Sequence, residues 1–120
     1  MKKILIVDDS SVVRMSLSFV LKDNGFQVTE AVDGQDGVRK AGAESFDLII
    51  TDVNMPNMNG IQLIEKIREG GTNKFIPILV LTTESGQDML DEGKKAGATG
   101  WIVKPFTNEK LLATIRKVIG

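Results

Sequence analysis

The fold of this chain is indicated most clearly by the segment Ile4-Leu5-Ile6-Val7-Asp8-Asp9-Ser10. Its four apolar residues follow one another without polar alternation, which is typical of a strand buried on both faces of a parallel sheet. The run Ile78-Leu79-Val80-Leu81 has the same character, and shorter or weaker apolar runs lie at 48–50, 101–103 and 26–29. We therefore predict five strands.

The segments between these runs are expected to be helices. Each has a start signal or apolar residues at helical spacing. The start signals are Ser10/Ser11, Asp33-Gly34 and the capping-box spacing from Ser85 to Asp88. The apolar faces consist of Val13, Leu17, Val20 and Leu21 after Ser10/Ser11; of Ile61, Ile64 and Ile67; and, after Thr107, of Leu111, Leu112, Ile115, Val118 and Ile119. Strands that alternate with helices predict an α/β, doubly wound domain, with a five-stranded parallel sheet and five flanking helices.

Composition excludes several classes of protein. The 120 residues predict one domain, and the net charge of −1 gives no reason to expect a nucleic-acid partner. The chain has neither Cys nor His, which excludes thiol nucleophiles, His general bases and soft-metal sites, so any metal must bind oxygen ligands. No apolar segment approaches the length of a membrane span, and we expect a cytoplasmic protein.

Polar side chains follow four of the five predicted strands. In open α/β sheets, ligands bind beyond the carboxyl ends of the strands. The residues that stand at these ends are Asp8, Asp9, Asp52, Asn54, Thr82, Thr83, Glu84 and Lys104. Taken singly, each has an ordinary explanation: solvated acids near a helix N-terminus, an Asx turn, a strand-ending threonine or a surface lysine.

Taken together, these strand-end residues indicate a reactive site. Three clustered carboxylates repel one another, and a hard divalent cation such as Mg²⁺ relieves that repulsion. A carboxylate beside Mg²⁺ is a nucleophile toward phosphorus, which would give an aspartyl phosphate at Asp52. Lys104 and the Thr82 hydroxyl are then available for the oxygens of the phosphoryl group.

The strand-end segments resemble those of response-regulator receiver domains, and in particular the stand-alone, CheY-like members. The resemblance runs over the whole chain and rests on the segments 4–10, 52–60, 81–84 and 100–106. It implies a flavodoxin-like fold with strand order 2-1-3-4-5. It also implies that residues 1–120 form a single receiver domain without an output domain, a signalling protein that only assists its own phosphorylation and dephosphorylation.

The resemblance assigns a role to each site residue. Asp52 is the phosphoacceptor; Asp9 and Asp52 bind Mg²⁺ (or Mn²⁺) directly, Asp8 acts largely through water, and Asn54 offers its backbone carbonyl. Thr82 and Lys104 contact the phosphoryl group, and the Lys104–Pro105 bond is expected to be cis. Thr82 and Trp101 form the switch, and Asn54, Thr83 and Glu84 tune the reaction. Two positions depart from the usual pattern: Trp101 replaces Tyr or Phe, and Thr83 replaces the smaller Ala.

Partners follow from the resemblance as well. The phosphodonor is expected to be a sensor histidine kinase or a phosphotransfer protein. The output is expected to be contact of a monomer with a target such as a flagellar motor switch protein, in chemotaxis. A relay intermediate or a phosphate sink is the alternative.

Three other functional interpretations of this sequence remain open. A phosphatase of the haloacid-dehalogenase type also uses an Asp nucleophile and Mg²⁺, although Asn54 stands where it would need an acid. A flavin-binding flavodoxin shares the fold, although Asp8 and Asp9 would repel its phosphate. A protein-binding pseudo-receiver would lack a site residue, and none is missing here.

Overall fold

Five parallel strands form one sheet in the order β2-β1-β3-β4-β5, which confirms the predicted topology. The computed structural model describes residues 2–71, 73–83 and 91–119 in full and the backbone of 87–90. The strands are β1 (Lys3–Val7), β2 (Gln27–Ala31), β3 (Leu48–Asp52), β4 (Ile78–Thr82) and β5 (Gly100–Val103). The central strands β1, β3 and β4 are buried on both faces, as their apolar runs predicted, whereas the edge strands β2 and β5 are partly exposed.

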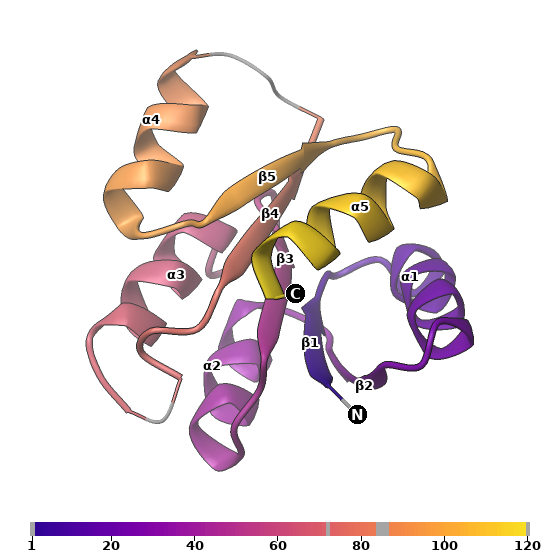
Figure 1. The fold of residues 1–120 in the computed structure, drawn as a ribbon. Helices are drawn as coiled ribbons and strands as arrows, with labels where there is room; N and C mark the ends of the chain where they lie inside the picture. Colours follow the sequence, from indigo (N-terminus) through magenta and orange to yellow (C-terminus); the bar gives the residue numbers. More distant parts are fainter. Residues whose placement is uncertain (1, 72, 84–86, 120) are drawn as a thin grey trace.

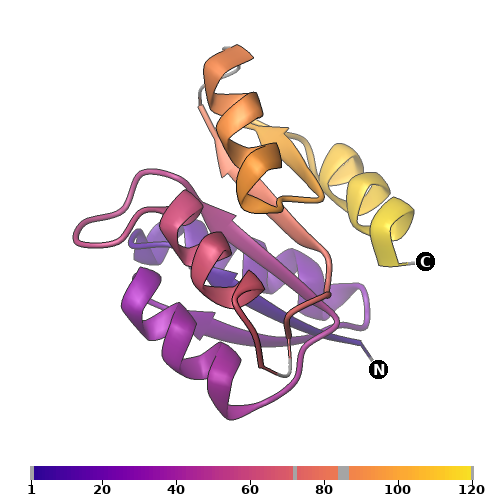
Figure 2. The same ribbon diagram turned by 90° about the vertical axis from the view of Figure 1, so that its left-hand side faces the viewer.

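Helices cover both faces of the sheet. Figure 1 shows α1 (Ser11–Asp23) and α5 (Asn108–Ile119) on one side, and α2 (Gly34–Ala43), α3 (Gly60–Arg68) and α4 (Gln87–Ala96) on the other. Figure 2 gives the same layers from the side. Alternate strand residues face the two layers: Leu5 and Val7 join the core under α2 and α3, whereas Ile4 and Ile6 join the core under α1 and α5. Among the described residues, no helix is both long and apolar enough to cross a membrane.

Several helix ends match the predicted signals. The Ser10 hydroxyl accepts the Val13 N–H at the start of α1, and the Asp33 carboxylate accepts the Asp36 N–H at the start of α2. The Thr107 hydroxyl likewise accepts the Lys110 N–H at the start of α5. The capping box expected from Ser85 to Asp88 lies outside the residues described in full.

Two sequence expectations need correction. The second strand begins and ends later than the predicted run at 26–29, because pairing with β1 extends it to Ala31. In α3, Leu63 is fully buried beside Ile64 and Ile67, whereas Ile61 is only partly buried. The spacing of the isoleucines identified the helix but not the centre of its buried face.

Gly37 lies within α2, although glycine disfavours the helical conformation. A Cβ at this position would lie 3.0 Å from Cγ2 of Val7, so the missing side chain lets α2 pack closely on β1. The local cost of about 1 kcal/mol relative to alanine is offset by this packing.

Candidate phosphoacceptor and metal site

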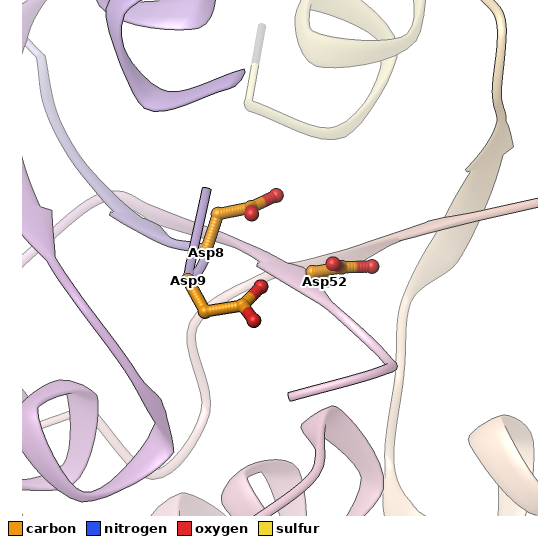
Figure 3. Close-up of side chains that lie close together, drawn as sticks. All are labelled: Asp8, Asp9 and Asp52. Atoms are coloured by element: carbon orange, nitrogen blue, oxygen red, sulfur yellow. The ribbon is translucent and has the colours of Figure 1, made fainter. Parts of the chain in front are cut away.

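Three carboxylates meet at the carboxyl ends of two neighbouring strands. Asp8 and Asp9 follow β1, and Asp52 ends β3, which pairs directly with β1. One oxygen from each carboxylate lies within 4.8 Å of the others. Figure 3 shows the side chains of Asp8 and Asp9 extending from the end of β1 toward Asp52. The structure thus brings together the acidic residues that the sequence placed at separate strand ends.

Asp52 is a buried residue held by its own loop. Only 8% of its surface is exposed, and its Oδ1 accepts the Val53 N–H at 2.8 Å. The start of α3 packs against it so closely that a Cβ on Gly60 would lie 2.2 Å from the Asp52 carbonyl oxygen. Glycine at position 60 is therefore a steric requirement of the connection between Asp52 and α3.

Asp8 carries an oxygen that the protein leaves without a hydrogen bond. Its Oδ1 accepts the Ser10 N–H at 2.9 Å, whereas its buried Oδ2 has no hydrogen-bond partner among the described residues. Burial is the main reason why the pKa of Asp8 is raised, and the nearby charges of Asp52 and Asp9 raise it further, although the Ser10 N–H and Lys104 act against them. The charged form of Asp8 is therefore disfavoured mainly by its burial.

Lys104 supplies an ammonium group that forms ion pairs with two of these carboxylates. Its Nζ lies 3.4 Å from Oδ1 of Asp52 and 3.7 Å from Oδ2 of Asp8, and 20% of its side chain is exposed. Its backbone N–H donates to the Thr82 carbonyl at 2.7 Å, which ties the lysine to the end of β4. The Lys104–Pro105 peptide bond is cis, as expected.

The donor set fits a hard divalent cation. All three acidic groups offer oxygen, which Mg²⁺ and Mn²⁺ prefer, and a single ammonium cannot balance three carboxylates. The buried Oδ2 of Asp8 has no hydrogen bond and only the 3.7 Å contact with Lys104, so a bound cation would stabilise it. The residues present are therefore suited to hold Mg²⁺.

The other predicted site residues differ in burial and in their place in the fold. Thr82 is buried at the end of β4, whereas Asn54 and Thr83 are exposed. Glu84 lies outside the described residues. Trp101 is partly buried on the edge strand β5, where it packs against the core under α2 and α3.

Arg14 is a neighbour of the site that the sequence analysis did not single out. Its Nη1 donates to the Asp8 carbonyl oxygen at 2.6 Å, and its Nε lies 3.4 Å from the Glu30 carboxylate. A signal was present, because Arg14 precedes the buried Leu17 and Leu21 by three and seven residues and so shares their face of α1. Helical spacing thus placed a charged side chain on the inner face.

The chain is similar to chemotaxis proteins over nearly its whole length. It is 41% identical to the chemotaxis protein CheY of Pseudomonas aeruginosa over 97% of this chain and 94% of that protein. It is also 41% identical to CheY-3 of Vibrio cholerae, over 97% and 90% of the two chains. These relatives agree with the CheY-like resemblance of the strand-end segments.

Solved structures agree in fold and in chain length. The chemotaxis protein CheY4 of Vibrio cholerae superposes with a TM-score of 0.95 at 47% identity, covering 98% of both chains. The receiver domain of a sensor histidine kinase from Pseudomonas aeruginosa has a TM-score of 0.92 at 28% identity, covering 99% of this chain and 98% of its own. That structure has a magnesium ion coordinated in its active-site cleft.

A model of a whole protein family also matches this chain. The model of the response regulator receiver domain matches residues 4–116, which include all the strands except the first residue of β1 and reach into α5. The match therefore spans the acidic cluster, Lys104 and the sheet that brings them together. With sequence, fold and site in agreement, the chain belongs to the family of response regulator receiver domains that serve two-component signalling.

Proposed function

We propose that Asp52 accepts a phosphoryl group from a phosphohistidine on a partner kinase or phosphotransfer protein. The observation that carries this proposal is the convergence of Asp8, Asp9 and Lys104 on the Asp52 carboxylate. A nucleophile toward phosphorus needs an accessible oxygen and nearby groups that neutralise the transferred charge. The 120 residues contain no His, which fits a domain that receives a phosphoryl group rather than donates one.

The proposed transfer forms one bond to phosphorus and breaks another. An oxygen of Asp52 forms a bond to phosphorus, the P–N bond of the donor breaks, and the imidazole nitrogen leaves with the electron pair of that bond. The Lys104 ammonium offsets negative charge on one phosphoryl oxygen, and the Thr82 hydroxyl donates to another. On this proposal the chain assists only its own phosphorylation and dephosphorylation. It therefore acts as a signalling component rather than as an enzyme with a separate substrate. We place it in the cytoplasm.

We assign the metal-holding role to Asp8, Asp9 and Asp52, with the backbone carbonyl of Asn54 as a further oxygen ligand. When bound, Mg²⁺ supplies positive charge for a phosphoryl oxygen that Lys104 does not reach. The magnesium ion in the related receiver domain of the sensor histidine kinase supports this assignment. Mn²⁺ has the same oxygen preference and should replace it.

For the output, we propose contact with a flagellar motor switch protein in chemotaxis. The support is similarity to proteins named for chemotaxis over more than nine-tenths of this chain. Thr82 and Trp101 are the proposed switch residues, and we assign Asn54, Thr83 and Glu84 the role of tuning the lifetime of the phosphoryl group. A phosphorelay intermediate or phosphate sink would use the same Asp52 chemistry with a different partner.

Phosphorylation with acetyl phosphate and Mg²⁺ tests the chemistry. The wild type should acquire one phosphoryl group that is labile to hydroxylamine, and Asp52→Asn should acquire none. Asp47→Asn is the matched control, because Asp47 is an exposed aspartate just before the same strand, and it should label like the wild type. Undiminished labelling of Asp52→Asn would refute the assignment.

A pulldown with beryllofluoride, which mimics the phosphoryl group on aspartate, tests the output. A purified flagellar motor switch protein should retain the chain with beryllofluoride and Mg²⁺ and release it without them. Equal retention in both conditions, or none in either, would reject the chemotaxis output while leaving the Asp52 chemistry intact.

A further inference from the structure

Asp8 is held at three of its four polar atoms. Its backbone N–H donates to the Ala31 carbonyl at 3.2 Å, and its carbonyl oxygen accepts from Nη1 of Arg14 at 2.6 Å. Its Oδ1 accepts the Ser10 N–H at 2.9 Å. These bonds come from β2, α1 and the loop between β1 and α1, and they leave Oδ2 as the oxygen without a hydrogen bond.

Arg14 is the side chain in this arrangement that joins two elements. Its guanidinium is largely buried, with 14% of the side chain exposed, and it bridges the Asp8 carbonyl oxygen and the Glu30 carboxylate. Glu30 lies on β2, where it pairs in register with Ile6 of β1. The planar fork of an arginine can serve two acceptors in fixed directions, which the single ammonium of a lysine cannot do.

We propose that Arg14, oriented by Glu30, is a positioning residue that sets the backbone at Asp8 and thereby aims Oδ2 at the acidic cluster. Groups behind a metal ligand commonly fix its orientation, and their loss weakens metal binding. Here the guanidinium holds the peptide that carries the ligand rather than the carboxylate itself. The inference rests on the proposed role of the cluster as a divalent-cation site.

Electrostatics and positioning predict opposite effects for loss of the guanidinium. Arg14 is a positive charge close to the proposed cation, so its removal should strengthen cation binding if charge alone matters. If Arg14 positions Asp8, its removal should weaken cation binding despite the more favourable charge. The sign of the change in affinity therefore separates the two explanations.

The test is a Mn²⁺ titration of the folded protein, with free Mn²⁺ followed by electron paramagnetic resonance. Arg14→Met should weaken binding by about tenfold, the low end of the range for residues that support a ligand. Arg14→Lys should fall between the wild type and Arg14→Met. Arg116→Met removes an exposed arginine from the last turn of α5 and serves as the matched control, with affinity close to wild type. Circular dichroism at the titration temperature confirms that each variant is folded.

A double-mutant cycle with Glu30→Gln identifies the route of the effect. Glu30→Gln alone should weaken Mn²⁺ binding several-fold, because Arg14 loses its anchor. In the Arg14→Met background it should change the affinity little. An equal loss in both backgrounds would mean that Glu30 acts by its charge, and the positioning role would be wrong.

The outcomes also separate this inference from the proposed function. Tight Mn²⁺ binding that is lost in Asp9→Ala but unchanged or strengthened in Arg14→Met would overturn only the role of Arg14. Failure of the wild type to bind Mn²⁺ would overturn the cation site itself. Weakening by Arg14→Met, partial retention by Arg14→Lys and non-additivity with Glu30→Gln would together establish the positioning role.

Discussion

The ammonium of Lys104 lies 3.4 Å from Oδ1 of Asp52, although Asp52 ends β3 and Lys104 follows β5. The same lysine donates its backbone N–H to the Thr82 carbonyl at 2.7 Å. Lys104 is therefore linked through its side chain to the proposed phosphoacceptor and through its main chain to the proposed switch residue. We expect a change at Asp52 to reach the end of β4 by this route.

We predict that Lys104→Arg impairs partner binding more than phosphorylation. The variant keeps the positive charge, so the rate of labelling by acetyl phosphate should fall by less than about tenfold, or about 1.4 kcal/mol. The guanidinium is wider than an ammonium and meets the phosphoryl oxygens off-centre, so the phosphorylated variant should fail to engage its target. Labelling kinetics and a pulldown measure the two effects, with the exposed Lys117→Arg as control. Normal target binding by the phosphorylated variant would remove Lys104 from the switch.

We predict that Asp9→Ala stabilises the metal-free protein. Removing one of three clustered carboxylates relieves repulsion with Asp8 and Asp52, and a gain of about 1 kcal/mol would raise the melting temperature by about 4 °C. Mg²⁺ should stabilise the wild type but not this variant, because only the wild type binds it tightly. Calorimetry with and without Mg²⁺ measures both effects, and Asp23→Ala at the end of α1 is the control. A lower metal-free melting temperature than wild type would contradict repulsion within the cluster.

We predict that phosphorylation changes the environment of Trp101. This residue is the only tryptophan, and it is partly buried on β5 beside β4, the strand that ends at Thr82. Movement of Thr82 toward a phosphoryl group would favour the packing in which the indole turns inward. Beryllofluoride with Mg²⁺ should shift the emission and reduce acrylamide quenching, and Asp52→Asn should abolish both changes. Constant emission and quenching during independently measured beryllofluoride binding would mean that Trp101 is a fixed edge residue.

We predict that the contribution of Asp36 to stability disappears in acid. Burial of this carboxyl favours its neutral form, but the Val32 N–H, Lys40 and Arg39 outweigh burial and lower its pKa. Because the folded pKa lies below the unfolded value of about 3.9, the stabilisation is full above that value and is lost as pH falls through the folded pKa. Asp36→Asn should cost about 2 kcal/mol at neutral pH and progressively less below about pH 4. Urea unfolding across this range measures the difference, and a constant difference would refute the linkage.

Local patterns in the sequence were enough to predict the five strands, most helix starts and the set of strand-end polar residues. An uninterrupted apolar run such as 4–7 can be satisfied only by burial on both faces, and parallel strands place their carboxyl ends at one edge. That geometry implied a meeting of Asp8, Asp9 and Asp52 before any distance was known. The strand order came from the family resemblance, because apolar periodicity identifies strands without naming their neighbours.

Contacts between side chains that lie far apart in the chain could not be predicted from the sequence, because they depend on how the elements pack. Helical spacing placed Arg14 on the inner face of α1, but only the packing of α1 beside β2 brought it to the Asp8 carbonyl oxygen and to Glu30. Packing likewise made Leu63 the fully buried residue of α3, and it set Lys104 between two carboxylates. Periodicity reports which face of an element is buried, whereas the direction and reach of a long polar side chain depend on neighbours that only the assembled fold supplies.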